Sequence, residues 1–283
     1  MSGVAAQERS AAIADPLADP LPPPPARRSR RQLAATAGWA LLSTLLLLGL
    51  WQLVSWRVGA DVLPGPLTSV RAIRFAVEDG YLWSDMAATG KRMAGAFLLA
   101  LVAGTVAGIV LGRSRIAALL FGSWVTILSS IPSLLLIVVT YLAIGLSDRG
   151  AIIGAALVVL PTLTFSVWQG VKALDPDLGE VARAFGVGRL TTVRRVLLPQ
   201  TLPFMFAAAR LGLALTWKIT IFVEVLGRSD GVGYRIQYWY NTADMQRVIG
   251  SALPFVLLML TLELAVLRPL ERHLFRWQRE EAR

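Results

Sequence analysis

The residues whose types and spacing best fit a specific task lie between positions 180 and 199, a polar stretch flanked by long apolar segments. Asp175 can cap a helix that begins at Pro176. An apolar stripe with the helical period follows, made of Leu178, Val181, Ala182 and Phe185. Gly186 stands where a residue in the left-handed conformation would end this helix. The pattern predicts a short amphipathic helix that stops at a glycine hinge.

A second short helix is expected from about Arg189, with basic residues along it, until Pro199 and Pro203 break it. Three interpretations of the hinged pair are open at this point. It is an ordinary basic connector, a DNA-binding helix-turn-helix, or a docking element that passes force between a membrane domain and a soluble partner. The flanking sequence decides among them.

The composition is that of a membrane protein. Hydrophobic residues make up 55% of the chain, charged residues 16%, and the mean hydropathy is +0.59. The net charge of +10 fits lysine and arginine enriched on the cytoplasmic side of a membrane. The chain has no cysteine and only one histidine, His273, so neither thiol chemistry nor a metal cluster is expected. No set of nucleophile, base and acid is evident, so no catalytic residue is predicted.

Uncharged segments indicate an all-α polytopic membrane protein with six transmembrane helices. The first, at residues 32–57, follows a disordered tail (residues 1–31) and is long enough to cross a bilayer. The others are expected at about 82–112, 116–147, 150–171, 202–226 and 248–267. The third is too long for one straight span, so Pro132 is expected to kink it. A basic tail (271–283) ends the chain.

Residues 58–81 form an external segment with an interfacial helix. In it Leu67, Val70, Ile73 and Val77 share one face, opposite charged residues. In the next span, small residues recur every four positions, at Ala100, Gly104, Gly108 and Gly112. Such a ridge lets another helix approach closely, and packing within the chain is favoured over a dimer seam. The loop that contains Gly231 and Tyr234 is expected on the external side.

Six spans place both termini on one side of the membrane. Lysine and arginine are more numerous on that side, so the termini and residues 180–199 are expected in the cytoplasm. This placement disfavours DNA binding, because membrane spans tether the stretch at both ends and no third helix completes a folded domain. A membrane-anchored helix-turn-helix regulator is kept as the alternative function, and no nucleic-acid partner is expected.

Four charged residues fall inside the spans, where charge is costly and so indicates pairing or function: Arg210, Lys218, Glu224 and Glu263. Arg210 and Glu263 lie at similar depths, so an ion pair between them is expected. Lys218 lies near the membrane midplane, where it attracts an anionic solute or pairs with another helix. Glu224 lies near the outer end of the fifth span and is a candidate for the translocation path.

The docking stretch resembles the E-A-A-x3-G-x9-I-x-L-P loop of permease subunits of binding-protein-dependent ABC importers. The matching positions are Glu180, Val181, Ala182, Gly186, Val196, Leu198 and Pro199. Every gap agrees, and the departures are Val181 for alanine and Val196 for isoleucine. In this family the loop couples to the ATPase, so the resemblance implies that role for these residues and for Phe185.

The resemblance extends over roughly residues 82–277. Ser130-Ile131-Pro132 looks like a turn of these permeases, and Trp217, Glu224 and Gly231-Val232-Gly233-Tyr234 resemble motifs of the nitrate, sulfonate, taurine and bicarbonate branch. The extra N-terminal helix and Pro64-Gly65-Pro66 do so as well. The resemblance implies a type I importer fold, with residues 82–270 as the transmembrane domain and a small anionic solute as cargo.

The resemblance also implies a division of labour among several chains in a bacterial inner membrane. Two permease copies, as a homodimer, form the path in the lipid bilayer, two cytoplasmic ABC ATPase subunits bind ATP and Mg²⁺, and an extracytoplasmic binding protein delivers the solute. This chain lacks the Gly-x4-Gly-Lys-Ser/Thr phosphate loop. It is therefore expected to bind no cofactor and not to be an enzyme.

Overall fold

The computed structural model describes residues 30–174, 184–192, 194–195 and 198–270, and the regular elements in these ranges are all helical. The chain divides into two compact units, one of residues 1–47 with 274–283 and one of residues 48–273. The second unit contains the core described below. The predicted tails, 1–31 and 271–283, lie outside the described residues except for Arg30 and Arg31, which begin the first helix.

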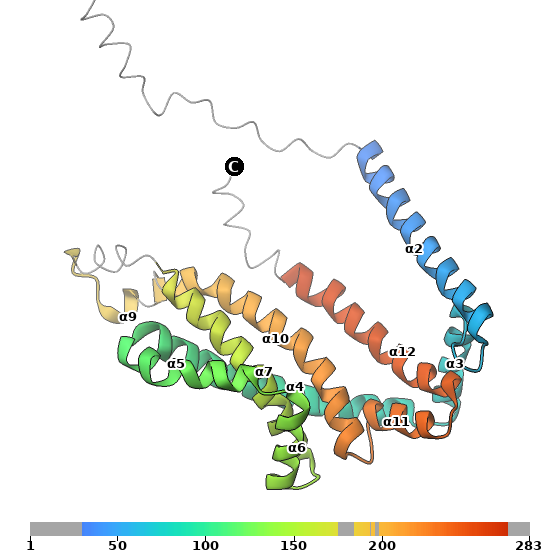
Figure 1. Ribbon diagram of the computed structural model, residues 1–283. Coiled ribbons are helices and arrows are strands. Elements are labelled where there is room, and N and C mark those ends of the chain that lie inside the picture. The colour runs from blue at the N-terminus through green and yellow to red at the C-terminus, as the bar shows by residue number, and fades with distance from the viewer. Residues whose placement is uncertain (1–29, 175–183, 193, 196–197, 271–283) are drawn as a thin grey trace, which may run out of the picture. The chain divides into compact units, whose positions relative to one another are not determined.

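The described helices are shown in Figure 1. They are α2 (Arg30–Val58), α3 (Pro66–Glu78), α4 (Leu82–Arg113), α5 (Arg115–Ser130), α6 (Ser133–Ile144), α7 (Asp148–Lys172), α9 (Arg189–Thr192), α10 (Leu198–Gly227), α11 (Val232–Asn241), α12 (Met245–Thr261) and the π-helix η2 (Leu262–Leu267).

Five segments are long and apolar enough to cross a membrane: Ala37–Val58, Leu82–Arg113, Asp148–Lys172, Gln200–Gly227 and Met245–Leu270. A sixth crossing is formed if α5 and α6 together count as one span. These two helices are bent by 100° at the break between them, where Ile131 and Pro132 lie. The kink predicted at Pro132 is therefore confirmed, and so is the all-helical membrane fold.

Two expectations about helix boundaries were wrong. The segment after Gly231 is a helix, α11 (Val232–Asn241), and not a loop, because side chains of α4 and α10 bind the amides at its start. The two prolines do not end a helix: α10 begins at Leu198 and contains both of them, whereas a break at Pro199 and Pro203 was expected. Pro199 lies in the first turn, where a missing N–H costs no intrahelical bond, and Pro203 is accommodated inside the helix.

The helix α3 turns a face of small residues toward the rest of the unit. Ser69, Ala72 and Ala76 are buried, and α3 packs against α12, where a side chain at Gly250 would collide with Ala72. Leu67 and Val70 stay exposed. An amphipathic helix that keeps such residues exposed while packing through its small residues suits a membrane interface.

The helix α7 is the centre of the core and packs against α4, α10, α6 and α5. The small-residue ridge of α4 faces it: Gly104, Gly108 and Gly112 lie against Leu163, Val167 and Val171. A Cβ atom on Gly108 would lie 2.7 Å from the Val167 Cβ. The expectation that the ridge packs within the chain is therefore confirmed, and the glycines are needed because the two backbones approach so closely.

The change Gly108→Ala is expected to destabilise the protein by about 1–3 kcal/mol, because the added methyl overpacks the contact with α7. Gly90→Ala is the matched control on the same helix, since a Cβ there has no neighbour within 4 Å. Alanine at that position should raise stability slightly, by up to about 1 kcal/mol. Thermal unfolding in detergent measures both. Equal melting temperatures for the two variants would contradict the close approach of α4 and α7.

Candidate functional site

The turn between α7 and α10 presents an aromatic side chain to its surroundings. Ala184 is helical, Phe185 and Gly186 form the turn, and the Phe185 side chain is 82% exposed. Gly186 has φ +68°, so the left-handed conformation predicted for it is confirmed. A Cβ on Gly186 would have no neighbour within 4 Å. The turn is thus a glycine hinge with an exposed ring beside it.

Part of the predicted docking stretch cannot be placed. Glu180, Val181, Ala182 and Val196 lie outside the described residues. Leu198 and Pro199 are the first two residues of α10. The second helix of the stretch, expected from Arg189 to Pro199, is described only as the single turn α9 (Arg189–Thr192).

Arg210 and Glu263, two of the four charged residues inside the spans, form the ion pair that was expected from their similar depths. Arg210 on α10 donates from Nε to the Glu263 Oε1 over 3.1 Å, and its Nη2 forms an ion pair with the same oxygen. Glu263 belongs to the π-helix η2, a geometry often found at functional sites. The pair therefore joins the N-terminal half of α10 to the last turns of the final span.

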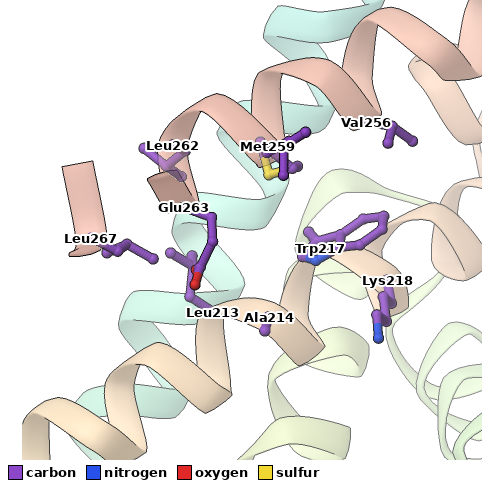
Figure 2. Close-up of a pocket in the computed structure, with 10 residues that line it drawn as sticks. Leu213, Ala214, Trp217, Lys218, Val256, Met259, Leu262, Glu263 and Leu267 are labelled. Carbon is purple, nitrogen blue, oxygen red and sulfur yellow. The ribbon is translucent and has the colours of Figure 1, made fainter. Parts of the chain in front are cut away.

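Lys218 is exposed, and its Nζ lies 5.8 Å from the centre of the Trp217 ring. Both residues line a cavity of about 300 Å³ between α10 and the helices α12 and η2 (Figure 2). Within the described ranges no carboxylate forms an ion pair with Lys218. Pairing with another helix, one of its two expected roles, is therefore not seen in this part of the chain.

Glu224 is fully buried, at 0% exposure, and is bound by three donors from two other helices, α4 and α11. Arg92 of α4 donates from Nη1 to Oε1 over 2.8 Å, the Thr89 hydroxyl donates to Oε2 over 2.8 Å, and the Gly233 amide donates to Oε2 over 2.9 Å. In this structure both carboxylate oxygens of Glu224 are bound by groups of the chain itself.

Arg92 binds two further carboxylates. Its Nε lies 2.7 Å from Asp148 of α7, and its Nη2 lies 2.5 Å from Asp230, just before α11. Arg228 approaches the same Asp148 oxygen at 3.2 Å. We call these residues, with Glu224, the Arg92 cluster. Sequence reasoning missed it, because Arg92 directly precedes the uncharged part of its span and was counted with the external charges.

The Arg92 cluster continues into the N-terminus of α11. The amides of Gly231, Val232 and Gly233 donate to Asp85, Thr89 and Glu224, respectively, over 3.1, 2.9 and 2.9 Å. Gly231 has φ +102°, and a Cβ on it would lie 2.5 Å from the Glu224 Oε1. The structure therefore explains why the Gly-Val-Gly sequence accompanies Glu224: any side chain at Gly231 would displace the buried carboxylate.

Comparison with known proteins places this fold in a family. A family model described as the binding-protein-dependent transport system inner membrane component matches residues 100–271, more than half of the chain. The chain belongs to this family. The permease is therefore a multi-pass inner-membrane subunit of a transporter and not an enzyme, and membership implies an ATPase and a solute-binding protein as its partners.

Relatives agree with this assignment. A probable ABC transporter permease protein of Brucella abortus is 29% identical over 241 residues, which cover 85% of this chain and 96% of that protein. SsuC of Bacillus subtilis, named for the transport of aliphatic sulfonates, is 27% identical over 245 residues, which cover 85% of this chain and 88% of SsuC. Other relatives are named for nitrate import and for taurine transport.

A solved structure shows the same fold. A chain of the MetNI methionine ABC transporter, in an inward-facing conformation, superposes with a TM-score of 0.60 at 22% sequence identity. The match covers 69% of the permease and 96% of that chain.

Proposed function

We propose that the permease forms the solute path of an ABC importer and that residues 180–199 dock on a cytoplasmic ATPase subunit that binds ATP and Mg²⁺. In this proposal residues 82–270 are the transmembrane domain, both termini lie in the cytoplasm, and two copies of the permease form the path. The solute is a small anion, delivered by an extracytoplasmic binding protein. The relatives named for sulfonate, nitrate and taurine transport support this class of solute.

One observation carries the docking role: Phe185 is 82% exposed next to a left-handed glycine, on a turn between two membrane-spanning helices. Exposure of a large aromatic ring to water is energetically unfavourable. Exposed apolar surface of this kind marks interaction sites, and aromatic residues that fill a pocket of a partner contribute much of the binding energy. The greater number of lysine and arginine residues on this side supports a cytoplasmic position for the turn, where the ATPase would bind.

The helices that flank the turn, α7 and α10, can transmit a movement of the docked turn into the membrane domain. α7 and α10 pack directly on each other: a Cβ on Gly170 would lie 2.5 Å from Phe204, and one on Gly212 would lie 2.7 Å from Leu163. Two helices in such close contact move together and not past each other. A displacement of the turn by the ATPase would then move α7 and α10 as a rigid body and exchange inward-facing and outward-facing states.

The change Phe185→Ser is expected to weaken the association of the permease with its ATPase roughly 30-fold, the loss of a hot-spot contact of about 2 kcal/mol. The measurement is the ATPase activity that co-purifies with the tagged permease from membranes. Phe75→Ser is the matched control, because Phe75 is an exposed phenylalanine of α3, which the proposed topology assigns to the opposite membrane face. Undiminished ATPase with Phe185→Ser would refute the docking role. Salt-sensitive binding of duplex DNA without any ATPase would favour the regulator instead.

A further inference from the structure

The cavity between α10 and the helices α12 and η2 has no role in the docking or in the Arg92 cluster. Its volume is about 300 Å³, at the small end of the range of roughly 300–1,000 Å³ for ligand sites. Figure 2 shows Trp217 and Lys218 of α10 on one side and Met259 and Val256 of α12 on the other. A cavity of this size suits a solute of few atoms.

Two charged residues, Glu263 and Lys218, line the cavity. Glu263 lines the cavity, but its carboxylate is neutralised by Arg210. Lys218 also lines it, and in the described part of the chain its ammonium group has the Trp217 ring beside it and no carboxylate in an ion pair. An unpaired ammonium within a membrane span is costly unless an anion or water reaches it. The cavity therefore attracts a single negative charge.

The remaining walls are apolar, with Leu213 and Leu260 among them in addition to Val256 and Met259. Compact anions such as nitrate and bicarbonate gain little from such walls, because they have no hydrocarbon part to bury. A solute with a short hydrocarbon body gains about 0.8 kcal/mol for each methylene group that it buries. The combination of one cation with apolar walls therefore selects an organic monoanion.

The π-helix η2 is a second, independent feature of the same cavity. It begins at Leu262 and includes Glu263 and Leu267, and all three residues line the cavity. A π-turn is a local departure from α-helical geometry that is frequent at functional sites.

We propose that this cavity is a binding site along the translocation path and that it holds a small organic monoanion, such as a short alkyl sulfonate, with its charged group on Lys218 and its hydrocarbon against Trp217 and Met259. The proposal rests on the proposed function as an importer of anions. It adds the position of the site and the preference for an anion with an apolar body.

The absence of cysteine from the chain makes a direct test possible. In Ala214→Cys the new thiol lines the cavity beside Trp217. Two thiol reagents of similar size probe it: the anionic sulfonatoethyl methanethiosulfonate and its cationic trimethylammonium analogue. The anionic reagent should react about tenfold faster than the cationic one, because it approaches Lys218 at short range in a medium of low dielectric. The rates are measured on the purified permease by mass spectrometry.

Variants of Lys218 test whether its charge causes the faster reaction of the anionic reagent. Adding Lys218→Gln to Ala214→Cys should abolish the tenfold ratio, and Lys218→Glu should reverse it, a result that misfolding would not produce. Leu211→Cys is the matched control: Leu211 is exposed on the same helix and does not line the cavity. The ratio there should not depend on Lys218. Equal rates for both reagents at Ala214→Cys, or a ratio that Lys218→Glu leaves unchanged, would overturn the proposal.

Protection tests the class of anion. Hexanesulfonate should slow the reaction of Ala214→Cys at least fivefold, and nitrate at the same concentration should not; equal protection by the two would refute the preference for an apolar body. The labelling needs no ATP, whereas the importer function is judged by the ATPase activity that co-purifies. If the two thiol reagents react equally fast while the ATPase still co-purifies with the permease, the proposed binding site is refuted and the importer function is not.

Discussion

Replacement of Arg92 by methionine is expected to destabilise the permease by about 3–5 kcal/mol, because it leaves a buried charge without its partner. Glu224 is fully buried and Arg92 is 2% exposed, so neither charge is solvated by water once the other is removed. Asp148 and Asp230 would lose the same cation, although both are partly exposed. The expected result is a large fall in melting temperature and poor recovery of folded protein, measured by thermal unfolding in detergent.

Two comparisons test this explanation. Arg74→Met removes an arginine from an exposed ion pair with Glu78 and should leave the melting temperature unchanged. The double variant Arg92→Met with Glu224→Gln should be more stable than Arg92→Met alone, because the amide carries no charge and still accepts from Thr89 or Gly233. If the two substitutions were additive, the proposed coupling between Arg92 and Glu224 would be wrong.

Replacement of Gly186 by valine is expected to reduce solute transport at least about tenfold while ATP hydrolysis persists. Gly186 has φ +68°, a conformation that costs a β-branched residue on the order of 1–3 kcal/mol. The turn would relax to another conformation and redirect Phe185, whereas the membrane helices keep their packing. Solute uptake per ATP hydrolysed, in proteoliposomes that hold the permease and its ATPase, measures the loss.

Gly188→Val is the matched control for this prediction. It adds the same side chain two residues later, at an exposed position where a Cβ has no neighbour within 4 Å and the backbone does not require glycine. Coupling should be retained in this variant. Should both valine variants transport at the rate of the unmodified permease, the hinge would have no part in coupling.

Local patterns were sufficient to predict much of the fold. Long uncharged runs located the membrane helices, Pro132 located the 100° bend, and the repeat of small residues that includes Gly108 predicted the tight contact of α4 with another helix. The ion pair of Arg210 with Glu263 could be inferred as well, because two opposite charges at equal depth in adjacent spans have few other partners. Each of these inferences depends on spacing along the chain or on depth in the membrane.

The Arg92 cluster could not be predicted in this way. Arg92 and Glu224 are 132 positions apart, and nothing in the sequence near either residue indicates its partner. The helix α11 was missed for a related reason: its first amides are bound by side chains of α4 and α10, so tertiary contacts and not a capping residue define its start. The cavity beside Lys218 likewise depends on how α10 meets α12, which periodicity does not specify.

The occupied amides at the start of α11 also restrict where an anion can pause. The beginning of a helix ordinarily attracts phosphate, sulfonate or nitrate groups through its free N–H donors and its partial positive charge. Here the donors of Gly231, Val232 and Gly233 are already saturated by oxygens of the chain itself. These three amides are therefore not available to bind an anion, and in the proposed path the start of α11 would not compete with the ammonium of Lys218 for the solute.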